Sequence, residues 1–140
     1  MENVYGIFNG KITKVMPSQA SKVFEGVTLI FHNSDVITAE AKYINSLFNS
    51  IGEVKIIDEQ EFDVGAEITS CAPAFISRIW MEFTKTASRN SGFSTEETDD
   101  MVIKTLYGTS KLLYEKNMGF DKLISSVATK GGITEEGLKF

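Results

Sequence analysis

The sequence has few of the residues that cross-link a chain or coordinate a metal. Among 140 residues there is one cysteine, Cys71, and one histidine, His32. A single cysteine cannot form an internal disulfide, so a cytoplasmic location is the expectation. One cysteine and one histidine far apart in the sequence do not make a zinc site. Only two prolines occur, so long helices are free to form.

Positive charge and long apolar runs are also scarce. Lysine and arginine total 14 against 19 aspartates and glutamates, which gives a formal net charge of −5 and disfavours binding to nucleic-acid phosphates. No apolar run approaches the roughly 20 residues that span a bilayer, and no signal-peptide pattern opens the sequence, so no membrane partner is expected.

What the sequence does contain is an ordinary globular composition, with 42% hydrophobic and 24% charged residues. At a prior of about 150 residues per domain, this length corresponds to one domain, or to one domain and part of another. A complete two-domain dehydrogenase is therefore excluded.

The first half predicts a strand, a helix and a second strand. Val27–Phe31 is a β-branched and apolar run that is typical of a buried strand. Thr38 is the predicted cap of the following helix, and Gly52 is predicted just past its end. Residues 54–57 form the second predicted strand, which we expect to pair parallel to the first. The apolar positions of the helix are Ile44, Leu47, Phe48 and Ile51.

From a boundary near residue 58 onward, the pattern predicts helices. Pro73 suits the first turn of one helix, and Ser94 with Glu97 forms a capping box that opens another, running to about Asn117. A shorter helix is centred on residues 123–127, and a further helix start follows Gly131-Gly132. Two apolar stripes, too large for one small helical half to cover, predict a dimer. They consist of Ile76, Ile79, Trp80 and Phe83, and of Val102, Leu106 and Leu113.

The run from Ala128 to Glu136 is a candidate anion site. A glycine pair can turn successive backbone N–H groups toward one point, and a helix start adds more free N–H groups. Such a turn suits a small carboxylate or phosphate. Glu135 and Glu136 oppose anion binding unless they point away, and a plain glycine-rich turn between two helices is the alternative interpretation.

Two other features have simpler explanations than catalysis. Cys71 precedes a helix start, where a thiol can be reactive, but no histidine accompanies it in sequence, so a small buried packing residue is the favoured interpretation. His32 is expected to be a solvated or hydrogen-bonded surface residue. The acidic stretches at residues 59–67 and 96–100 need not be metal sites, because the second suits the first turns of a helix.

Five short segments occur in the order found in one known family. They are Met16-Pro17-Ser18, Val27 to Phe31, Gly52-Glu53-Val54, Ser70 to Phe75, and Ala128 to Thr134. Over nearly the whole chain, from about Ile12 onward, they resemble the pyrroline-5-carboxylate reductases and the reductase-like late competence proteins. The resemblance implies the βαβ end of a Rossmann domain in residues 1–58. An all-α dimerisation domain of the 6-phosphogluconate-dehydrogenase C-terminal type is implied in residues 59–140.

The resemblance also implies a reaction and a site. Members of the family reduce 1-pyrroline-5-carboxylate to proline with NAD(P)H, a hydride transfer in which the protein mainly positions cofactor and substrate. The implied substrate site consists of Gly131, Gly132, Ile133 and Thr134, which grip the carboxylate, together with Cys71 and Arg78. The implied contacts to the nicotinamide side of the cofactor are Met16, Pro17 and Ser18. No catalytic residue is assigned.

Several positions depart from the family pattern. Ser18 replaces an Asn, Ala72 a Gly and Lys130 a Pro, and Arg78 stands where many members carry a Thr. No Gly-x-Gly-x-x-Gly follows a strand. The resemblance therefore implies that most of the Rossmann domain and the last helix are missing, and that NAD(P)H is not held tightly by this chain alone.

The expected function is the substrate-binding and dimerisation part of a reductase, a homodimer that takes a proline-like carboxylate and is not catalytically competent by itself. The alternative is a non-enzymatic dimeric interaction module built on the same fold. An acidic helical domain with no recognisable chemistry is the least favoured interpretation.

Overall fold

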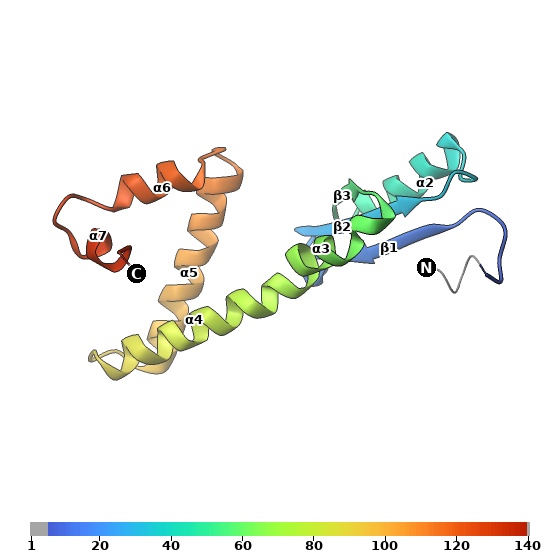
Figure 1. Cartoon of the computed structure of the whole chain (residues 1–140). Coiled ribbons are helices and arrows are strands. Elements are labelled where there is room, and N and C mark those ends of the chain that lie inside the picture. Colours follow the sequence, from blue (N-terminus) through green and yellow to red (C-terminus); the bar gives the residue numbers. More distant parts are fainter. Residues whose placement is uncertain (1–5, 140) are drawn as a thin grey trace. The chain divides into compact units, whose positions relative to one another are not determined.

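The computed structural model describes residues 6–139, and the chain divides into two compact units, Met1–Arg78 and Ile79–Phe140. In the first unit, three strands form one sheet in the order β1 (Thr13–Pro17), β2 (Gly26–His32), β3 (Gly52–Ile56). β2 runs parallel to β3 and antiparallel to β1 (Figure 1). Helix α2 (Thr38–Asn49) connects the two parallel strands, which confirms the predicted strand–helix–strand unit. β1 was not predicted, although it forms one edge of the sheet.

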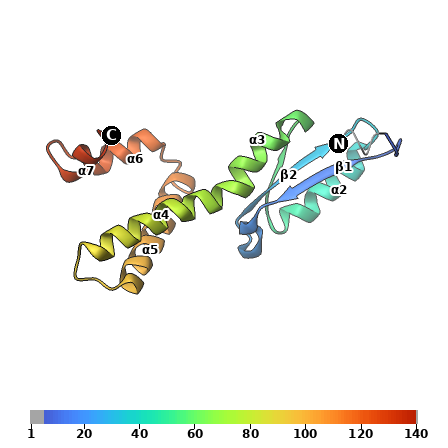
Figure 2. The same cartoon turned by 60° about the horizontal axis from the view of Figure 1, so that its bottom comes forward.

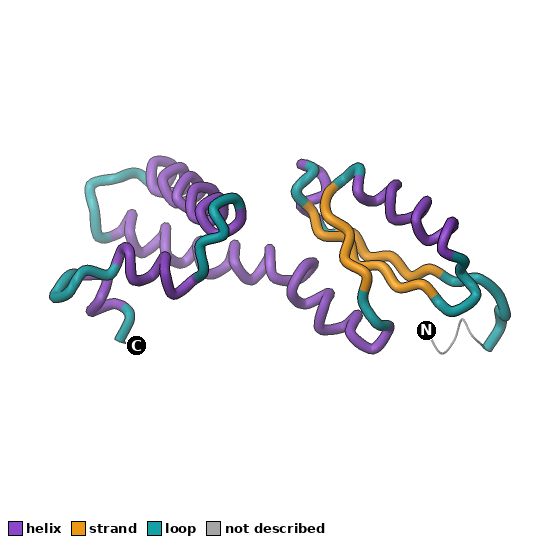
Figure 3. The backbone as a smooth tube through the Cα atoms, turned by 90° about the horizontal axis from the view of Figure 1, so that it is seen from above, coloured by secondary structure: helices purple, strands orange, loops and turns teal. Residues whose placement is uncertain are grey.

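Helices cover both faces of this sheet. α2 packs on β2 and β3 along one face (Figure 3), and α3 (Phe62–Ala66) packs on β2 from the other. Ile30 and Phe62 are almost completely buried and, with Leu29, form the centre of the core. The Lys14 ammonium lies 4.2 Å from the centre of the Phe62 ring, a cation–π contact that extends the core toward β1.

Gly52 holds the start of β3 against β2, and is not the helix-ending residue that we predicted. α2 ends at Asn49 with Ser50 as its cap, whereas Gly52 is the first residue of β3 and has φ +146°. A Cβ atom there would lie 2.1 Å from the Gly26 carbonyl oxygen. The glycine is needed for this close approach of two backbones and for its left-handed φ.

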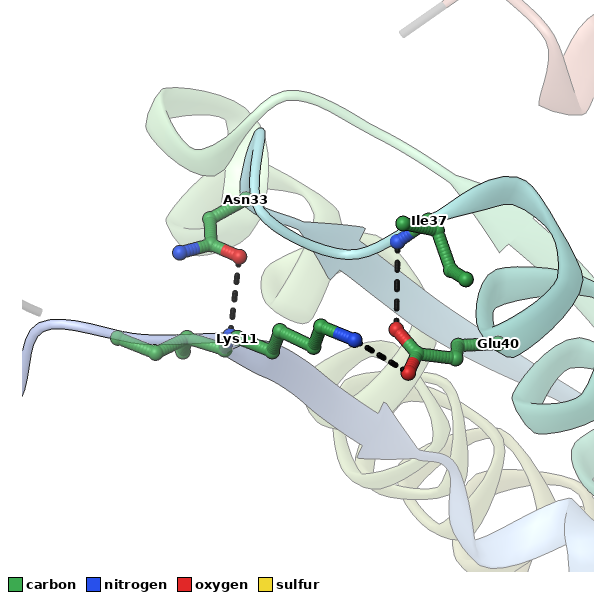
Figure 4. Close-up of polar contacts among 5 residues, drawn as sticks. Lys11, Asn33, Ile37 and Glu40 are labelled. Atoms are coloured by element: carbon green, nitrogen blue, oxygen red, sulfur yellow. Dashed lines mark hydrogen bonds and ion pairs between the residues drawn. The ribbon is translucent and has the colours of Figure 1, made fainter.

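The N-terminus of α2 is capped by residues other than Thr38, so that prediction is wrong by one position. Ile37 has the extended backbone of an N-cap, and its N–H donates to the Glu40 carboxylate at 3.3 Å. The Lys11 ammonium binds the same carboxylate at 2.5 Å (Figure 4) and holds the pKa of Glu40 below its ordinary value. Isoleucine has no side-chain acceptor, so Glu40 alone provides the side-chain cap.

Pro73 is the second residue of α4 (Ala72–Arg89) and so lies in its first turn, as predicted, although further helical segments directly precede it. A 3₁₀ turn (η2, Glu59–Glu61), α3, a π-helical segment (η3, Glu67–Cys71) and α4 (Ala72–Arg89) follow one another without a break (Figure 1). Proline lacks an N–H and crowds the carbonyl four residues earlier in a regular helix. The wider π segment immediately before it accommodates this defect.

The second unit consists of the C-terminal part of α4 and the helices α5 (Thr95–Tyr114), α6 (Phe120–Val127) and α7 (Ile133–Gly137). The predicted capping box of α5 is confirmed, because Glu97 N–H donates to Ser94 Oγ at 3.2 Å and Ser94 N–H donates to the Glu97 carboxylate at 2.8 Å. α5 ends at Tyr114, three residues earlier than predicted, and Asn117 has a left-handed φ of +48°.

The helices of the second unit enclose little apolar surface. Among its described residues, one hydrophobic side chain, Val102, is buried, together with the hydroxyl residues Thr84 and Thr98. Ile79 and Phe83 are 66% and 56% exposed. In the part of the chain described here, no helix combines the length and the apolar character needed to cross a membrane.

The capping box of α5 predicts a loss of stability in acid. The backbone N–H and the hydroxyl of Ser94 donate to the Glu97 carboxylate and hold its pKa below the ordinary value of 4.5. A depressed pKa stabilises the fold above the unfolded-state pKa, and this stability is lost as the pH falls through the folded-state value. We expect Glu97→Gln to lose less stability than the unaltered chain between pH 6 and pH ~3.5. Urea unfolding followed by circular dichroism measures the difference. Glu96→Gln is the control, and an equal response from both variants would contradict the assignment.

Candidate functional site

The glycine pair forms the turn that was predicted to hold an anion. Gly131 has φ +75° and Gly132 is the N-cap of α7. Gly132 N–H donates to the Thr129 carbonyl at 2.9 Å, which closes the turn. A Cβ atom on Gly132 would lie 2.7 Å from Thr129 Oγ1 and 3.0 Å from the Thr129 carbonyl oxygen, so a side chain at this position would require Thr129 to shift.

A carboxylate from the chain itself binds this turn. Gly131 N–H donates to the Glu135 carboxylate at 2.6 Å, a short charge-assisted hydrogen bond. Glu135 thus points toward the glycine pair, the orientation that opposes binding of an outside anion. Ile133 and Thr134 are exposed at the first turn of α7. The geometry shows that the turn accepts a carboxylate, and that Glu135 supplies one.

Cys71 and Arg78 belong to the first unit and are both exposed. The expectation that Cys71 is a buried packing residue is wrong, because no described residue covers the last position of the π segment. Beside it the Ser70 hydroxyl is buried without a hydrogen-bond partner among the described residues, whereas Thr69 Oγ1 donates to the Gly65 carbonyl at 2.9 Å. Cys71 lies in a different compact unit from the glycine turn.

Met16, Pro17 and Ser18 lie at the end of β1, where the chain turns toward β2. Ser18 is 8% exposed, and its hydroxyl accepts the Val27 N–H at 3.1 Å while its own N–H donates to the Val27 carbonyl at 3.2 Å. Pro17 is exposed and Met16 half-buried. Thr28, opposite Pro17 in the sheet, is fully buried, and its hydroxyl has no partner among residues 6–139. The hydroxyl and the N–H of Ser18 therefore stabilise the connection between β1 and β2 through their hydrogen bonds to Val27.

The described residues do not fit the pyrophosphate of a dinucleotide. A dinucleotide site places a glycine-rich loop and a helix N-terminus at the end of a parallel strand. Here α2, the helix that follows β2, has Ile37 as its N-cap, and the Ile37 N–H donates to the Glu40 carboxylate. A carboxylate at that position repels phosphate.

His32 is half-buried and hydrogen-bonded, as predicted. Its Nδ1 lies 2.9 Å from Thr13 Oγ1 and its Nε2 3.1 Å from Asn45 Oδ1. The carboxamide acceptor implies that Nε2 carries the proton, so Nδ1 accepts from the threonine hydroxyl. His32 therefore joins β1, β2 and α2, a structural role that its sequence position did not reveal. Within residues 6–139, no group of three or more His, Cys, Asp or Glu side chains is placed to hold a metal.

Together these features define a class of protein in which the end of a Rossmann-type sheet is joined to a helical dimerisation domain. Residues 59–140 match the family model for pyrroline-5-carboxylate reductase dimerisation. The chain belongs to the pyrroline-5-carboxylate reductase family, as the ordered motifs indicated.

Two curated relatives in Bacillus subtilis illustrate the range of the family. The chain is 41% identical over 126 residues to pyrroline-5-carboxylate reductase 3, covering 90% of this chain and 46% of that protein. It is 32% identical over 130 residues to ComE operon protein 4, covering 92% and 47%. The chain thus spans about half the length of the curated relatives it matches.

Solved structures give the same fold. The crystal structure of Plasmodium falciparum pyrroline carboxylate reductase with NADP bound matches with a TM-score of 0.83 and 30% identity, covering 91% of this chain and 50% of that one. The Streptococcus pyogenes 1-pyrroline-5-carboxylate reductase matches with a TM-score of 0.85 at 21% identity, covering 91% and 49%, a likeness of fold alone. The predicted α/β remnant followed by a helical domain is confirmed.

The contact between Glu135 and Gly131 predicts a measurable effect on the turn. Glu135→Gln removes the charge that strengthens the hydrogen bond, so we expect the Gly131 amide to exchange its hydrogen about tenfold faster, in keeping with about 1.4 kcal/mol for a charge-assisted bond. Hydrogen exchange followed by NMR measures this. Glu136→Gln is the neighbouring control, and an unchanged Gly131 rate in Glu135→Gln would show that the contact is not formed in solution.

Proposed function

We propose that this chain is the dimerisation and substrate-side part of a pyrroline-5-carboxylate reductase-type oxidoreductase, with its domain boundary near residue 58. It pairs as a homodimer through its helices, presents a turn for a small carboxylate, and does not complete the reaction without the rest of a dinucleotide-binding domain. The observation that carries the proposal is the uncovered apolar surface of the helices within the region matched by the dimerisation model.

The homodimer is supported by what the helical unit leaves exposed. Ile103 and Tyr107 on α5 and Phe120 on α6 are more than half exposed, in addition to Ile79 and Phe83 on α4. Large exposed apolar patches on soluble proteins commonly mark surfaces that a partner covers, and the exposed apolar side chains of these helices are candidates for such a surface.

One part of the expected interface needs correction, because Val102 is buried within the unit and Leu106 and Leu113 are half-buried. Ile103 and Tyr107 supply the exposed apolar surface of α5 in their place.

The carboxylate site is proposed at Gly131, Gly132, Ile133 and Thr134. Cys71 and Arg78, which belong to the first unit, are proposed separately as substrate contacts on the family resemblance alone. The bond from Gly131 N–H to Glu135 supports this assignment, because one amide of the turn already binds a carboxylate oxygen. A substrate carboxylate would displace Glu135, which implies weak binding. A proline-like ligand is the proposed occupant, since the family is named for the reaction that connects pyrroline-5-carboxylate with proline.

The cofactor role is proposed only for the intact reductase. Met16, Pro17 and Ser18 would contact the nicotinamide side of NAD(P)H there, with exposed Pro17 the most accessible of the three. The phosphates need groups that residues 6–139 do not offer. The chain by itself is therefore proposed not to hold NAD(P)H tightly.

A non-enzymatic dimeric module is the second candidate. The occupied glycine turn favours it, because a carboxylate built into the chain at Glu135 reduces the affinity for an outside one. The 32% identity to ComE operon protein 4 is compatible with this alternative.

Dimerisation predicts a specific sensitivity of the helical surface. Ile103→Ser removes one exposed apolar side chain from α5, and we expect the dimer dissociation constant to rise at least about tenfold, the effect of an interface residue worth about 1.4 kcal/mol. Sedimentation equilibrium over a concentration series measures it. Lys122→Ser on α6 is the control for the same substitution at an exposed charged position. A chain that is monomeric at 100 micromolar, or a variant that dimerises normally, would contradict the interface.

The carboxylate turn predicts a weak and specific affinity for L-proline. Isothermal titration should show saturable binding that L-prolinamide, which lacks the carboxylate, does not reproduce. Glu135→Gln should strengthen binding by removing the internal competitor, and Gly132→Val should weaken it, because a side chain there would force Thr129 to shift and distort the turn. Equal affinities in all variants, or no binding even in Glu135→Gln, would refute the site and favour the module.

A further inference from the structure

Asn9 and Gly10 lie in the segment that leads into β1, and each of them has a polar group that is not hydrogen-bonded. Asn9 is exposed. Neither its carboxamide nor the Gly10 N–H has a hydrogen-bond partner among residues 6–139. This segment lies at the same end of the sheet as the loop between β2 and α2 (Figure 2). The side chain of Asn9 is therefore able to approach the backbone nitrogen that follows it.

The chain immediately after this nitrogen is fixed by Asn33. Its Nδ2 donates to the Gly10 carbonyl at 2.8 Å, and its Oδ1 accepts the Ile12 N–H at 2.9 Å (the second bond is drawn in Figure 4). On the other side, the Phe8 ring lies close to Gly10, because a Cβ atom on Gly10 would be 2.7 Å from it. Gly10 is thus held through its carbonyl, while its N–H stays unbonded.

An unbonded carboxamide followed by an unbonded N–H is a reactive pair. The Gly10 nitrogen attacks Cγ of Asn9, the carbon–nitrogen bond of the carboxamide breaks, and ammonia leaves with the proton of the Gly10 N–H. The product is a cyclic imide, which water opens at either of its two carbonyls to give aspartate or isoaspartate. Glycine favours the attack, because it has no side chain in the way and few restrictions on its backbone angles.

The fold restrains the other asparagines among residues 6–139. Four of them have a hydrogen-bonded carboxamide and are followed by a serine, whose side chain hinders the attack. They are Asn33, Asn45, Asn49 and Asn90. After Asn117 the next N–H is engaged, because Met118 N–H donates to the Leu112 carbonyl at 3.3 Å. Within the described part of the chain, Asn9 alone combines a free carboxamide, a free following N–H and a glycine.

We propose that Asn9 is a site of spontaneous modification, at which the chain converts its own carboxamide to a carboxylate through attack by the Gly10 nitrogen, with water as the co-reactant. The site lies on a groove of about 400 Å³ that Asp35 also lines. Conversion therefore adds a second carboxylate to the residues that line this groove. The isoaspartate form also lengthens the backbone between residues 9 and 10, which moves Phe8 away from Gly10.

The modified chain remains folded, because the altered bond precedes the contacts that anchor β1. The bonds of Asn33 to the Gly10 carbonyl and the Ile12 N–H lie on the C-terminal side of the change. The two forms thus share one sheet and differ in the charge and shape of the groove. The proportion of the modified form increases with the age of the protein.

The test incubates the complete chain in mildly alkaline buffer and follows each asparagine peptide by digestion and mass spectrometry. We expect the Asn9 peptide to convert at a rate within about twofold of its rate in guanidinium chloride, because the folded chain does not protect it. Gly10→Ala should slow the conversion at least about tenfold, since a side chain hinders the attack. Asn9→Asp, which carries the aspartate product, should keep the urea midpoint of the unaltered chain and the slow exchange of the Ile12 amide.

A matched control separates the fold from the dipeptide. Ser34→Gly gives Asn33 a following glycine at an exposed position. In the folded chain Asn33 should still convert at least about tenfold more slowly than Asn9, because the hydrogen bonds of its carboxamide must first break, whereas in guanidinium chloride the two rates should be similar. The proposal is overturned if Asn9 converts only in the unfolded chain, or if Asn33 in folded Ser34→Gly converts as fast as Asn9. Dimerisation and the glycine turn involve none of these residues, so this inference fails independently of the proposed function.

Discussion

Apolar surface that the helices cannot bury among themselves is the constraint on which the organisation of this chain depends. From Ile79 onward a single hydrophobic side chain, Val102, is buried among the described residues, and a helical unit with so small a core gains little stability on its own. Its amphipathic helices nevertheless have good local signals, such as the capping box at Ser94. The local signals define the helices, whereas their exposed apolar faces are left for a partner of the proposed dimer to cover. Formation of that dimer would stabilise this unit, because binding to the folded state alone shifts the unfolding equilibrium.

The first unit, in contrast, buries its central apolar side chains within itself. β2 is the central strand and is covered by helices on both faces, so that Ile30 and Phe62 are enclosed while the flanking strands remain partly open. Polar contacts then fix β1 and α2 around this centre, with His32 bonded to a residue of each. The sheet is therefore well buried at its central strand β2, whereas the flanking strands β1 and β3 are only partly buried.

Much of this fold followed from local sequence patterns, and the failures have identifiable causes. The run Val27–Phe31 and the Ser94 capping box predicted their elements well, because each depends on neighbouring residues. β1 gave no clear signal, since its alternation is obscured by Lys14, whose ammonium contacts the distant Phe62 ring. Gly52 was misassigned because its need for a left-handed backbone comes from the Gly26 carbonyl across the sheet. The sequence motifs identified the glycine turn, but only the structure shows that the Glu135 carboxylate binds the Gly131 amide.

The π segment Glu67–Cys71 has a consequence for which changes of length this helix can accept. A π segment is equivalent to an α-helix with one residue inserted, and in a regular α-helix each inserted residue would advance the following side chains by about 100°. The wide turn takes up this extra residue, so deleting one residue between Glu67 and Cys71 would restore a regular helix while Ile79 and Phe83 kept approximately their present face. It would also return the ring of Pro73 to the crowded position opposite the carbonyl four residues earlier. The same deletion further along α4, where no wide turn takes it up, would rotate every later side chain by about 100°.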